Sequence, residues 1–333
     1  MKKLLVTGGA GFIGSNFLYF LNDTLDFSQY EVHVLDALTY SGHYETIASL
    51  IDSKKFHFFE IDIRNNSALN ELFEEHQYDG VLHFAAESHV DRSIVDPGIF
   101  LETNVNGTLN LLHASLALWK KNSEFRYLQV GTDEVYGHLT ETEPAFTEQT
   151  HIAPNSPYSA SKASADLLVR AYHQTYGLNT VITRCSNNYG RFQFPEKLIP
   201  LMIHNIVNDK KLPVYGDGSN IRDWIHVDDH NRGVWAVFEK GRSGEVYNLG
   251  GDAEMKNLDL VKLLLDSLEK PHSLIEFVTD RLGHDFRYAM NFSKAKEELG
   301  WEPKISFEEG IQDTIKWYLE NKSWVESVLA KSS

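Results

Sequence analysis

The sequence is poor in cysteine. Cys185 is the only cysteine among 333 residues, so no disulfide can form within the chain. This usage is typical of a reducing compartment, and we expect a cytoplasmic protein. Cys185 ends an apolar run, where a small buried side chain is its expected role.

The sequence also lacks clustered positive charge and long hydrophobic runs. Its net charge is −16, and it contains no basic run. Nucleic acid and anionic membrane surfaces are therefore poor partners. No apolar stretch approaches the roughly 18 residues of a membrane span. The first apolar stretch ends at residues 7–9, which is too short for a signal peptide.

Strand and helix patterns alternate through the first half of the chain. Such alternation predicts an α/β fold of the Rossmann type, a doubly wound parallel sheet with helices on both faces. The expected strands cover residues 4–6, 31–35, 56–61, 81–85, 127–130 and 180–183, and the expected helices cover 11–21, 66–75, 97–121 and a segment beginning near Pro157.

The second half of the chain differs in composition and in the order of its expected helices and strands. After about residue 186, prolines, glycines and aromatic residues become more frequent, and helices are less regularly paired with strands. We expect a smaller, mixed α/β lobe that closes over the first. The predicted Rossmann domain covers residues 1–188 and about 224–252, and the second lobe covers about 189–223 and 253–333. A strand over residues 245–249 is expected to rejoin the first sheet.

A glycine-rich turn follows the first strand and opens the first helix. Gly8 and Gly11 permit the close approach of a pyrophosphate, and Gly14 permits close packing of helix on strand. Asp36 ends the second strand, where a carboxylate binds an adenosine ribose and repels a 2′-phosphate, so NAD is favoured over NADP. The alternative is a glycine turn without a ligand. Asp62 either contacts the adenine or caps the helix that follows.

Polar groups follow the strand over residues 127–130. Thr132, Asp133 and Glu134 lie just beyond its carboxyl end, where an open parallel sheet binds its ligands. Two adjacent carboxylates suit a reaction in which one group gives a proton and the other takes one.

A tyrosine and a lysine share one face of a predicted helix. Tyr158 and Lys162 are four residues apart. The ammonium is expected to lower the pKa of the phenol, which then accepts a proton from an alcohol. Such a pair in isolation is often only an exposed surface feature.

Together these motifs resemble the extended short-chain dehydrogenase/reductase superfamily. Within it, longer segments are similar to the dTDP-glucose 4,6-dehydratase family, from the first glycines to about residue 310. The acid pair Asp133-Glu134 is the most specific element, because related epimerases and decarboxylases lack it. The similar segments are residues 83–91, 131–137, 186–190, 194–200 and 222–224.

The resemblance implies that a sugar nucleotide, dTDP-glucose, loses water to give a 4-keto-6-deoxy sugar while NAD is regenerated in each turnover. Tyr158, assisted by Lys162, would deprotonate the C4 hydroxyl, and Thr132 would hydrogen-bond the C4 oxygen. Glu134 would remove the C5 proton. Asp133, with a raised pKa, would protonate the departing C6 hydroxyl.

The resemblance also implies a homodimer and a place in deoxysugar biosynthesis, such as that of rhamnose for cell-surface polysaccharide. The dimer would be built on the predicted helix over residues 97–121 and the helix beginning near Pro157.

Binding residues are assigned by the same resemblance. Those expected near NAD, besides Tyr158 and Lys162, are Gly8, Gly11, Phe12, Ile13, Gly14, Asp36, Leu38, Thr39, Asp62, Ile63, Ala85, Ala86, Thr103 and Asn188. Those expected near the substrate, besides Thr132, are Ser88, His89, Asn187, Lys197, Leu198, Pro213, Tyr215, Arg222, Asn257, Arg281 and His284. Ion-pair or surface roles stay open for Arg222 and Arg281, and a core role stays open for Tyr215. Two departures from the family pattern, Arg191-Phe192 and Leu282, leave the fit of the nucleotide open.

Several alternatives remain. The first alternative is a 4,6-dehydratase that acts on another nucleotide sugar. The second is a 4-epimerase or decarboxylase, and the third is an NAD-binding regulator without activity. An epimerase needs no acid pair, and a regulator is expected to lose Tyr158, Lys162 or that pair. No metal is expected. His226 and His230 share a helical spacing, but we expect Asp228 or Asp229 to begin a helix there and the histidines to be packed or solvated.

Overall fold

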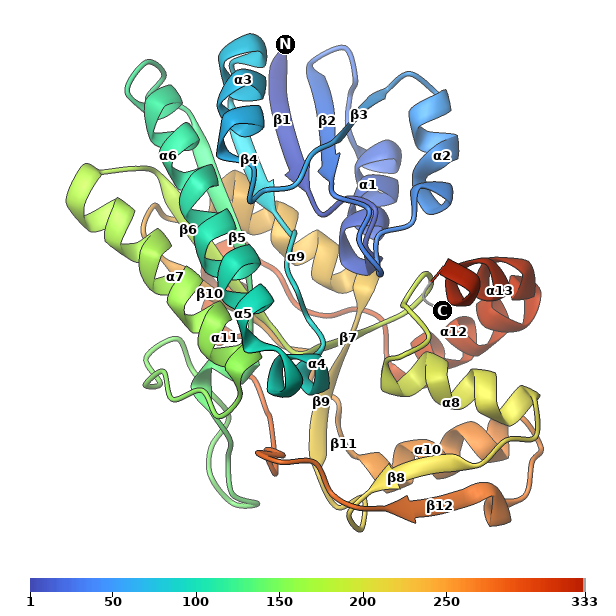
Figure 1. Cartoon of the computed structure of the whole chain (residues 1–333). Helices are drawn as coiled ribbons and strands as arrows, with labels where there is room; N and C mark the ends of the chain where they lie inside the picture. Colours follow the sequence, from blue (N-terminus) through green and yellow to red (C-terminus); the bar gives the residue numbers. More distant parts are fainter. Residues whose placement is uncertain (332–333) are drawn as a thin grey trace.

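The computed structural model describes residues 1–331 and contains a seven-stranded, fully parallel sheet in the order β10-β6-β5-β4-β1-β2-β3 (Figure 1). This order confirms the predicted doubly wound fold, and the strand expected at residues 245–249 does rejoin the sheet beside β6. The strand order reverses between β1 and β4, which opens a crevice at their carboxyl ends. The strands are β1 Lys2–Thr7, β2 Tyr30–Asp36, β3 Phe56–Glu60, β4 Gly80–His83, β5 Arg126–Thr132, β6 Thr180–Cys185 and β10 Val246–Leu249.

Helices cover both faces of this sheet. Alternate strand residues point to opposite faces, so Val6 packs in the core under α1 and α9, while Leu5 packs in the core under α3, α6 and α7. The elements of this part are α1 Phe12–Thr24, α2 Tyr44–Asp52, α3 Asn66–His76, α4 Val90–Val95, α5 Pro97–Phe100, the π-helix η1 Leu101–Gly107, α6 Thr108–Trp119, the 3₁₀ turn η2 Asp133–Tyr136, α7 Pro157–Tyr176 and α9 Val227–Lys240. Cys185 ends β6 as a buried side chain, as predicted.

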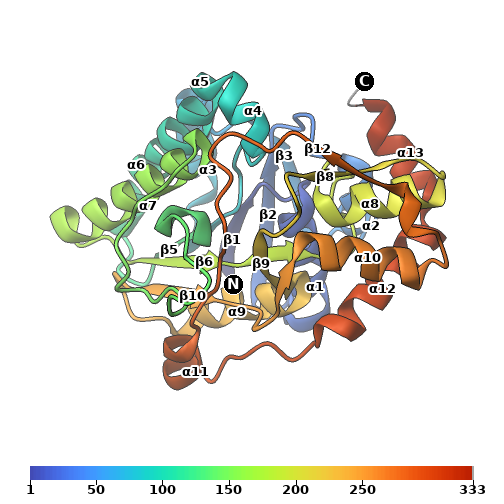
Figure 2. The same cartoon turned by 90° about the horizontal axis from the view of Figure 1, so that it is seen from below.

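A second lobe has a hydrophobic cluster of its own, which includes Ile203, Leu264 and Ile315. It holds two small sheets, β11-β9-β7 and β12-β8. Seen from below, this lobe lies on the side opposite to α6 and α7 (Figure 2). Its elements are β7 Asn187–Tyr189, α8 Leu198–Val207, β8 Leu212–Tyr215, β9 Ile221–His226, β11 Glu254–Lys256, α10 Asn257–Ser267, η3 His272–Leu274, β12 Ile275–Val278, α12 Phe307–Glu320 and α13 Lys322–Lys331.

The helix α11 (Ser293–Leu299) returns to the first lobe late in the chain. Ala295 and the following Trp301 pack into the core beneath α1 and α9. The boundaries expected for the two domains stay a prediction.

The long helix expected over residues 97–121 differs in the structure. It runs as α5, the π-helix η1 and α6, placed end to end. The wider π turn places the buried Asn104 so that its amide donates to Glu87 O at 3.0 Å and to Ser161 Oγ at 2.9 Å. Tertiary hydrogen bonds of this kind leave no mark in the hydrophobic spacing, so the pattern alone predicts one regular helix.

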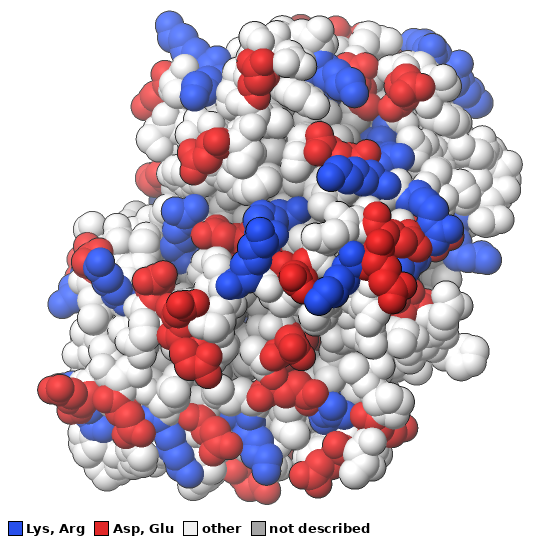
Figure 3. All heavy atoms as spheres, turned by 180° about the vertical axis from the view of Figure 1, so that it is seen from behind, with Lys and Arg blue, Asp and Glu red and all other residues white. Residues whose placement is uncertain are grey.

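The surface carries charges of both signs. On the face shown in Figure 3, lysine and arginine side chains alternate with acidic ones rather than form one continuous patch. Within residues 1–331, none of the helices is both long enough and apolar enough to cross a membrane.

Candidate active site

A tight turn joins β1 to α1 at the carboxyl edge of the sheet. Gly8 has φ +72°, and a Cβ on it would lie 2.5 Å from Ala85 N. A Cβ on Gly14 would lie 2.1 Å from Gly8 O. Only glycine fits either position without moving backbone. Gly11 precedes α1 and caps it with no side-chain hydrogen bond, which leaves the first N–H groups of the helix for an anion.

Asp36 is held rigidly at the end of β2. Its carboxylate accepts hydrogen bonds from Ala10 N at 2.9 Å and Leu38 N at 2.8 Å. Burial raises the pKa of Asp36 above its usual value, and the backbone donors oppose that rise. Each oxygen keeps a second lone pair, which suits a carboxylate that accepts from ribose hydroxyls.

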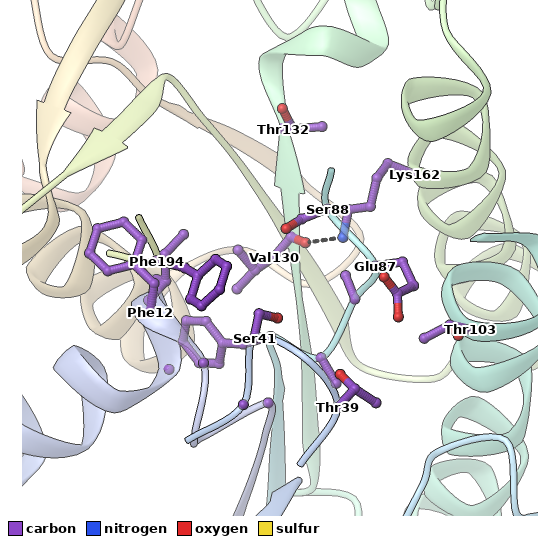
Figure 4. Close-up of a pocket in the computed structure, with 18 of the residues that line it drawn as sticks. Phe12, Thr39, Ser41, Glu87, Ser88, Thr103, Val130, Thr132, Lys162 and Phe194 are labelled. Atoms are coloured by element: carbon purple, nitrogen blue, oxygen red, sulfur yellow. Dashed lines mark hydrogen bonds between the residues drawn. The ribbon is translucent and has the colours of Figure 1, made fainter. Parts of the chain in front are cut away.

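A cavity of about 300 Å³ opens between this turn and the second lobe (Figure 4). It brings together residues from the ends of β1, β2, β3, β4, β5 and β6, which are far apart in sequence. The predicted cofactor residues that line it are Gly8, Gly11, Phe12, Ile13, Gly14, Asp36, Thr39, Asp62, Ile63, Ala85, Ala86, Thr103 and Asn188. The predicted catalytic and substrate residues that line it are Thr132, Asp133, Glu134, Tyr158, Lys162, Ser88, Asn187 and Lys197.

The helix α7 carries Tyr158 and Lys162 into this cavity. It begins sharply because Ser156 and Ser159 form a reciprocal capping box and Pro157 occupies the first turn. Lys162 is buried, and its Nζ donates to Val130 O at 2.8 Å, the contact drawn in Figure 4. Burial lowers the pKa of Lys162 from its usual value.

The expected lowering of the Tyr158 pKa is wrong for this structure. Burial raises it well above its usual value, and the charges of Glu134 and Asp133 add to the rise, while a hydrogen bond with Thr132 opposes it. The shared helix face of Tyr158 and Lys162 does not reveal that the phenol also lies near carboxylates. It becomes a base only when positive charge in the cavity offsets them.

The two carboxylates of the acid pair lie in a buried 3₁₀ turn, η2. Asp133 is 2% exposed, and its Oδ2 has no hydrogen-bond partner among residues 1–331. Its Oδ1 accepts from Thr132 Oγ1 at 3.2 Å. Burial raises the pKa of Asp133 well above its usual value, and the charge of Glu134 raises it further. The raised pKa expected for Asp133 is thereby confirmed.

The charges around Glu134 differ from those around Asp133. Burial raises its pKa as well, but the positive charges of Arg222, Arg281 and Lys197 act against the rise. A carboxyl group that faces cations is the easier of the two to ionise. The two carboxyl groups thus differ in their electrostatic surroundings, which suits a pair in which one group gives a proton and the other takes one.

Lys197 lines the cavity, and Arg222 and Arg281 lie outside its wall but near enough for their charges to act on Glu134. Lys197 Nζ donates to Ser88 O at 2.7 Å. The buried Arg222 donates to Asp285 O at 2.9 Å, and its guanidinium lies 4.4 Å from the centre of the Tyr288 ring. Arg222 is therefore fixed by main-chain carbonyl groups and an aromatic ring, and no carboxylate among residues 1–331 forms an ion pair with it.

Arg281, His284 and Tyr215 lie on the second lobe close to these cations. Arg281 is 3.5 Å from Asp91, yet its buried Nε has no partner among the described residues. His284 Nδ1 is 2.6 Å from Asp280, and its ring lies edge-on to Tyr215 at 6.1 Å. An exposed tyrosine beside a free guanidinium N–H suits a nucleotide, although these roles stay predictions.

None of the other predicted residues lies in the cavity wall, and this includes Arg222, Arg281, His284 and Tyr215. Leu38 donates its N–H to Asp36, and His89 lies 3.6 Å from Glu196. Leu198 packs on the second core, Pro213 lies in β8, and Asn257 begins α10 with an unpartnered buried Oδ1.

Sequence reasoning gave no role to a cluster that bridges the two lobes. Glu196, which lines the cavity, accepts from Tyr40 Oη at 3.2 Å and lies 3.4 Å from Arg92. The guanidinium of Arg92 lies 3.6 Å from the centre of the Tyr40 ring. The sequence did point to Glu196, because it belongs to residues 194–200, one of the segments similar to the dehydratase family. It did not point to the contact, because 156 positions separate Tyr40 from Glu196 in the chain.

The histidines at 226 and 230 offer no shared ligand geometry. His226 caps α9, and Asp228 and Asp229 lie in its first turn, as predicted. His230 is buried with neither ring nitrogen partnered among the described residues, and burial lowers its pKa to about 3.

Comparison with known proteins gives a consistent result. Residues 5–314 match the family model described as GDP-mannose 4,6 dehydratase. A dTDP-glucose 4,6-dehydratase of Xanthomonas campestris pv. campestris (strain B100) is 52% identical over 345 residues, which cover 99% of this chain and 96% of that protein.

Two solved structures are also similar. DesIV, a dTDP-glucose 4,6-dehydratase from Streptomyces venezuelae with NAD bound, has a TM-score of 0.92 and 46% identity over 98% of this chain and 99% of its own. A UDP-glucose 4-epimerase from Thermotoga maritima has a TM-score of 0.87 and 30% identity over 96% and 99%.

Proposed function

The chain belongs to the dTDP-glucose 4,6-dehydratase family, and we propose that it converts dTDP-glucose to dTDP-4-keto-6-deoxy-glucose. It is an NAD-dependent enzyme of the hydro-lyase class that regenerates its cofactor in each turnover. The observation that carries this proposal is the acid pair. Asp133 is buried with a free Oδ2 and a raised pKa, beside a Glu134 that faces three cations.

The residues around the glycine turn fit NAD. The surface at Gly8 and Gly14 is a cradle that a Cβ would fill, and the carboxylate of Asp36 stands where a 2′-phosphate would be repelled. When bound, NAD would supply the hydride acceptor for the oxidation at C4 and the hydride donor for the reduction at C6, with C5 taking up a proton as C6 is reduced. Gly11 and the start of α1 would hold the pyrophosphate, and Asp36 would hold the ribose.

Oxidation at C4 requires a base for the hydroxyl proton. Tyr158 takes that proton in our proposal, because its phenol lies beside Thr132 at the cavity wall. Thr132 would orient the C4 oxygen. Lys162, fixed by Val130 O, supplies the nearby positive charge that a phenolate needs.

Elimination of water requires a base and an acid on one substrate. The C4 ketone makes the C5 proton acidic, and Glu134 removes it. Asp133 donates its proton to the C6 hydroxyl, which departs as water. The protonated state of Asp133 costs little here, since burial and Glu134 both disfavour its charge.

The nucleotide end of the substrate would lie against the second lobe. Arg222, Arg281 and Lys197 present positive charge to a diphosphate, and guanidinium groups donate bidentately to such oxygens. We further assign Ser88, His89 and Asn187 to the sugar or diphosphate, and Leu198, Pro213, Tyr215, Asn257 and His284 to the nucleotide pocket.

Incubation with dTDP-, UDP-, GDP- and CDP-glucose tests the proposal through the mass of the product. We expect loss of one water from dTDP-glucose at the highest kcat/KM. A product of unchanged mass would favour a 4-epimerase, and water loss mainly from another nucleotide would overturn the assigned base. Absence of turnover on all four would favour an NAD-binding regulator.

We also propose a cytoplasmic homodimer that takes part in deoxysugar biosynthesis, such as that of rhamnose for cell-surface polysaccharide. Its interface would use η1 and α6, which run end to end, and α7, which lies beside them on one flank (Figure 1). These elements expose Leu101, Leu167 and Tyr176. Light scattering tests this proposal. Leu167→Lys should give a monomer, whereas Phe277→Lys, at an exposed site on β12, should not.

A further inference from the structure

Two histidines and a glutamate meet at the edge of the sheet, away from the cavity. His33 on β2 is the direct register partner of His57 on β3, and Glu31 lies two residues before His33 on the same face of β2. We name Glu31, His33 and His57 the edge histidine cluster. Cross-strand pairing brings these residues together, so their sequence spacing gave no sign of a shared site.

The ligand atoms of the cluster lie close enough to share one ion. One atom from each of the three side chains lies within 4.8 Å of the others. His33 Nε2 and Glu31 Oε1 are 2.8 Å apart. Two ligands of a tetrahedral zinc ion are about 3.3 Å apart, given Zn–N and Zn–O lengths of about 2.0–2.1 Å. His57 is exposed, so its ring is free to close the remaining gap.

The surroundings of His33 orient it as a metal ligand. Its Nδ1 lies 2.9 Å from the buried Tyr78 Oη, which fixes the ring and directs Nε2 toward Glu31. A hydrogen bond on the second ring nitrogen is the usual companion of a metal-binding histidine. His33 is 2% exposed, so its ring is held in place by the surrounding side chains.

We propose that the edge histidine cluster binds one divalent transition-metal ion, with zinc as the expected species, through His33 Nε2, His57 and Glu31. Two imidazoles and one carboxylate form a ligand set that suits zinc, and water completes the tetrahedral coordination.

Neighbouring groups are compatible with a cation at this place. Lys3 Nζ is 3.6 Å from Glu31 Oε2, which leaves Oε1 for the metal. The ring of His76, at the end of α3, packs edge-on against His33 with centroids 4.5 Å apart and walls the site on that side.

The role of the metal is structural rather than catalytic. None of the cluster residues lines the cavity. β3 is the last strand of the sheet and pairs only with β2 within the described chain. An ion bound by residues of both strands would hold β3 to β2. It would also raise the apparent stability of the fold, because any ligand that binds only the folded state does so.

Calorimetric titration of the tag-free holoenzyme with Zn²⁺ measures the stoichiometry and affinity. We expect about one equivalent per chain, and we expect His57→Ala and Glu31→Gln each to weaken binding by at least tenfold, since loss of an outer-shell partner alone costs about 10–100-fold. Both positions are partly or fully exposed, so these variants should fold. His151→Ala, at an exposed loop histidine, is the matched control and should bind as the wild type does.

A crystal soaked in Zn²⁺ locates the ion by its anomalous scattering. The expected peak lies among Glu31, His33 and His57, and thermal unfolding of the wild type should shift upward with Zn²⁺ while that of His57→Ala does not. The proposal is overturned by absence of stoichiometric binding, by unchanged affinity in either cluster variant, or by a peak elsewhere. Turnover of dTDP-glucose is unaffected in each of these cases, so failure here is distinct from failure of the proposed dehydratase activity.

Discussion

Asp133 and Glu134 are neighbours in the chain but lie in different electrostatic surroundings. Asp133 faces the carboxylates of Glu134 and Asp223, and its Oδ2 has no partner in the described structure. Glu134 faces the positive charges of Arg222, Arg281 and Lys197. Environments that push two titratable groups apart are the usual basis of an acid and base assignment. These contacts support the proposed roles, Asp133 as the acid and Glu134 as the base.

Glu134→Gln tests the base at C5. The amide keeps the shape of the side chain but accepts no proton, so water elimination should fall by about 10²- to 10⁴-fold, the usual worth of a positioned base. Oxidation at C4 does not need Glu134, so reduced nicotinamide should accumulate and be visible in the near-ultraviolet absorbance. Product mass measures the elimination step. Normal formation of the 4-keto-6-deoxy product would contradict the assignment.

Asp133→Asn should stabilise the folded protein at neutral pH while it abolishes dehydration. The raised pKa of Asp133 means that folding takes up a proton above the unfolded pKa of about 3.9. The free energy of unfolding therefore falls as the pH rises from about 3.9 toward the folded pKa of Asp133. The fall is about 1.4 kcal/mol for each pH unit between the two pKa values. The variant avoids this loss.

Thermal unfolding of Asp133→Asn and of the wild type, compared from pH 4 to pH 8, measures this effect. The gain in melting temperature should shrink as the pH falls toward 4. Glu326→Gln, at an exposed acid on α13, should show no such gain. An equal gain at every pH would point to packing rather than to titration.

The strands of the first lobe could be predicted from the sequence because strands buried on both faces read as nearly continuous apolar runs. The acid pair was found for the same reason, since it interrupts the end of one such run. The small sheet β11-β9-β7 escaped prediction, because its three-residue strands β7 and β11 pair only through tertiary contacts. The expected lowering of the Tyr158 pKa was wrong because the phenol is buried and because the carboxylates near it come from another element, η2.

Asn104→Ala tests the reason for the π-helix η1. The side chain accepts from Glu87 N at 2.8 Å and donates to Glu87 O and Ser161, which joins the loop after β4 to α7. Its removal leaves buried groups unpaired, at about 1–3 kcal/mol for each. We expect a lower free energy of unfolding in urea and a higher KM for NAD.

The matched control for this change is Asn70→Ala on α3. Asn70 is exposed, and its amide makes only a surface contact, with Asn66 at 3.2 Å. Its unfolding and KM should stay near those of the wild type. An Asn104→Ala protein with unchanged stability would show that η1 has another cause.

At the scale of the whole molecule, the cavity is closed by a contact between lobes. Glu196 in the second lobe meets Tyr40, in the loop after β2, and Arg92 in α4. The sequence indicated a second lobe that closes over the first but not where the two meet. Such contacts depend on the relative placement of packed elements, which local patterns do not encode.

Glu196→Gln should therefore weaken retention of NAD. The change removes the charge that Arg92 and His89 face while it keeps the side-chain volume. Arg92 is half exposed, so solvent screening limits the loss to about 1 kcal/mol, or about fivefold in affinity. The fraction of NAD that stays with the protein through gel filtration measures the effect, with Glu308→Gln on α12 as the control. Because the contact is electrostatic, the difference between the variant and the wild type should shrink as salt is added. A difference that persists undiminished in high salt would assign the effect to packing at the lobe junction instead.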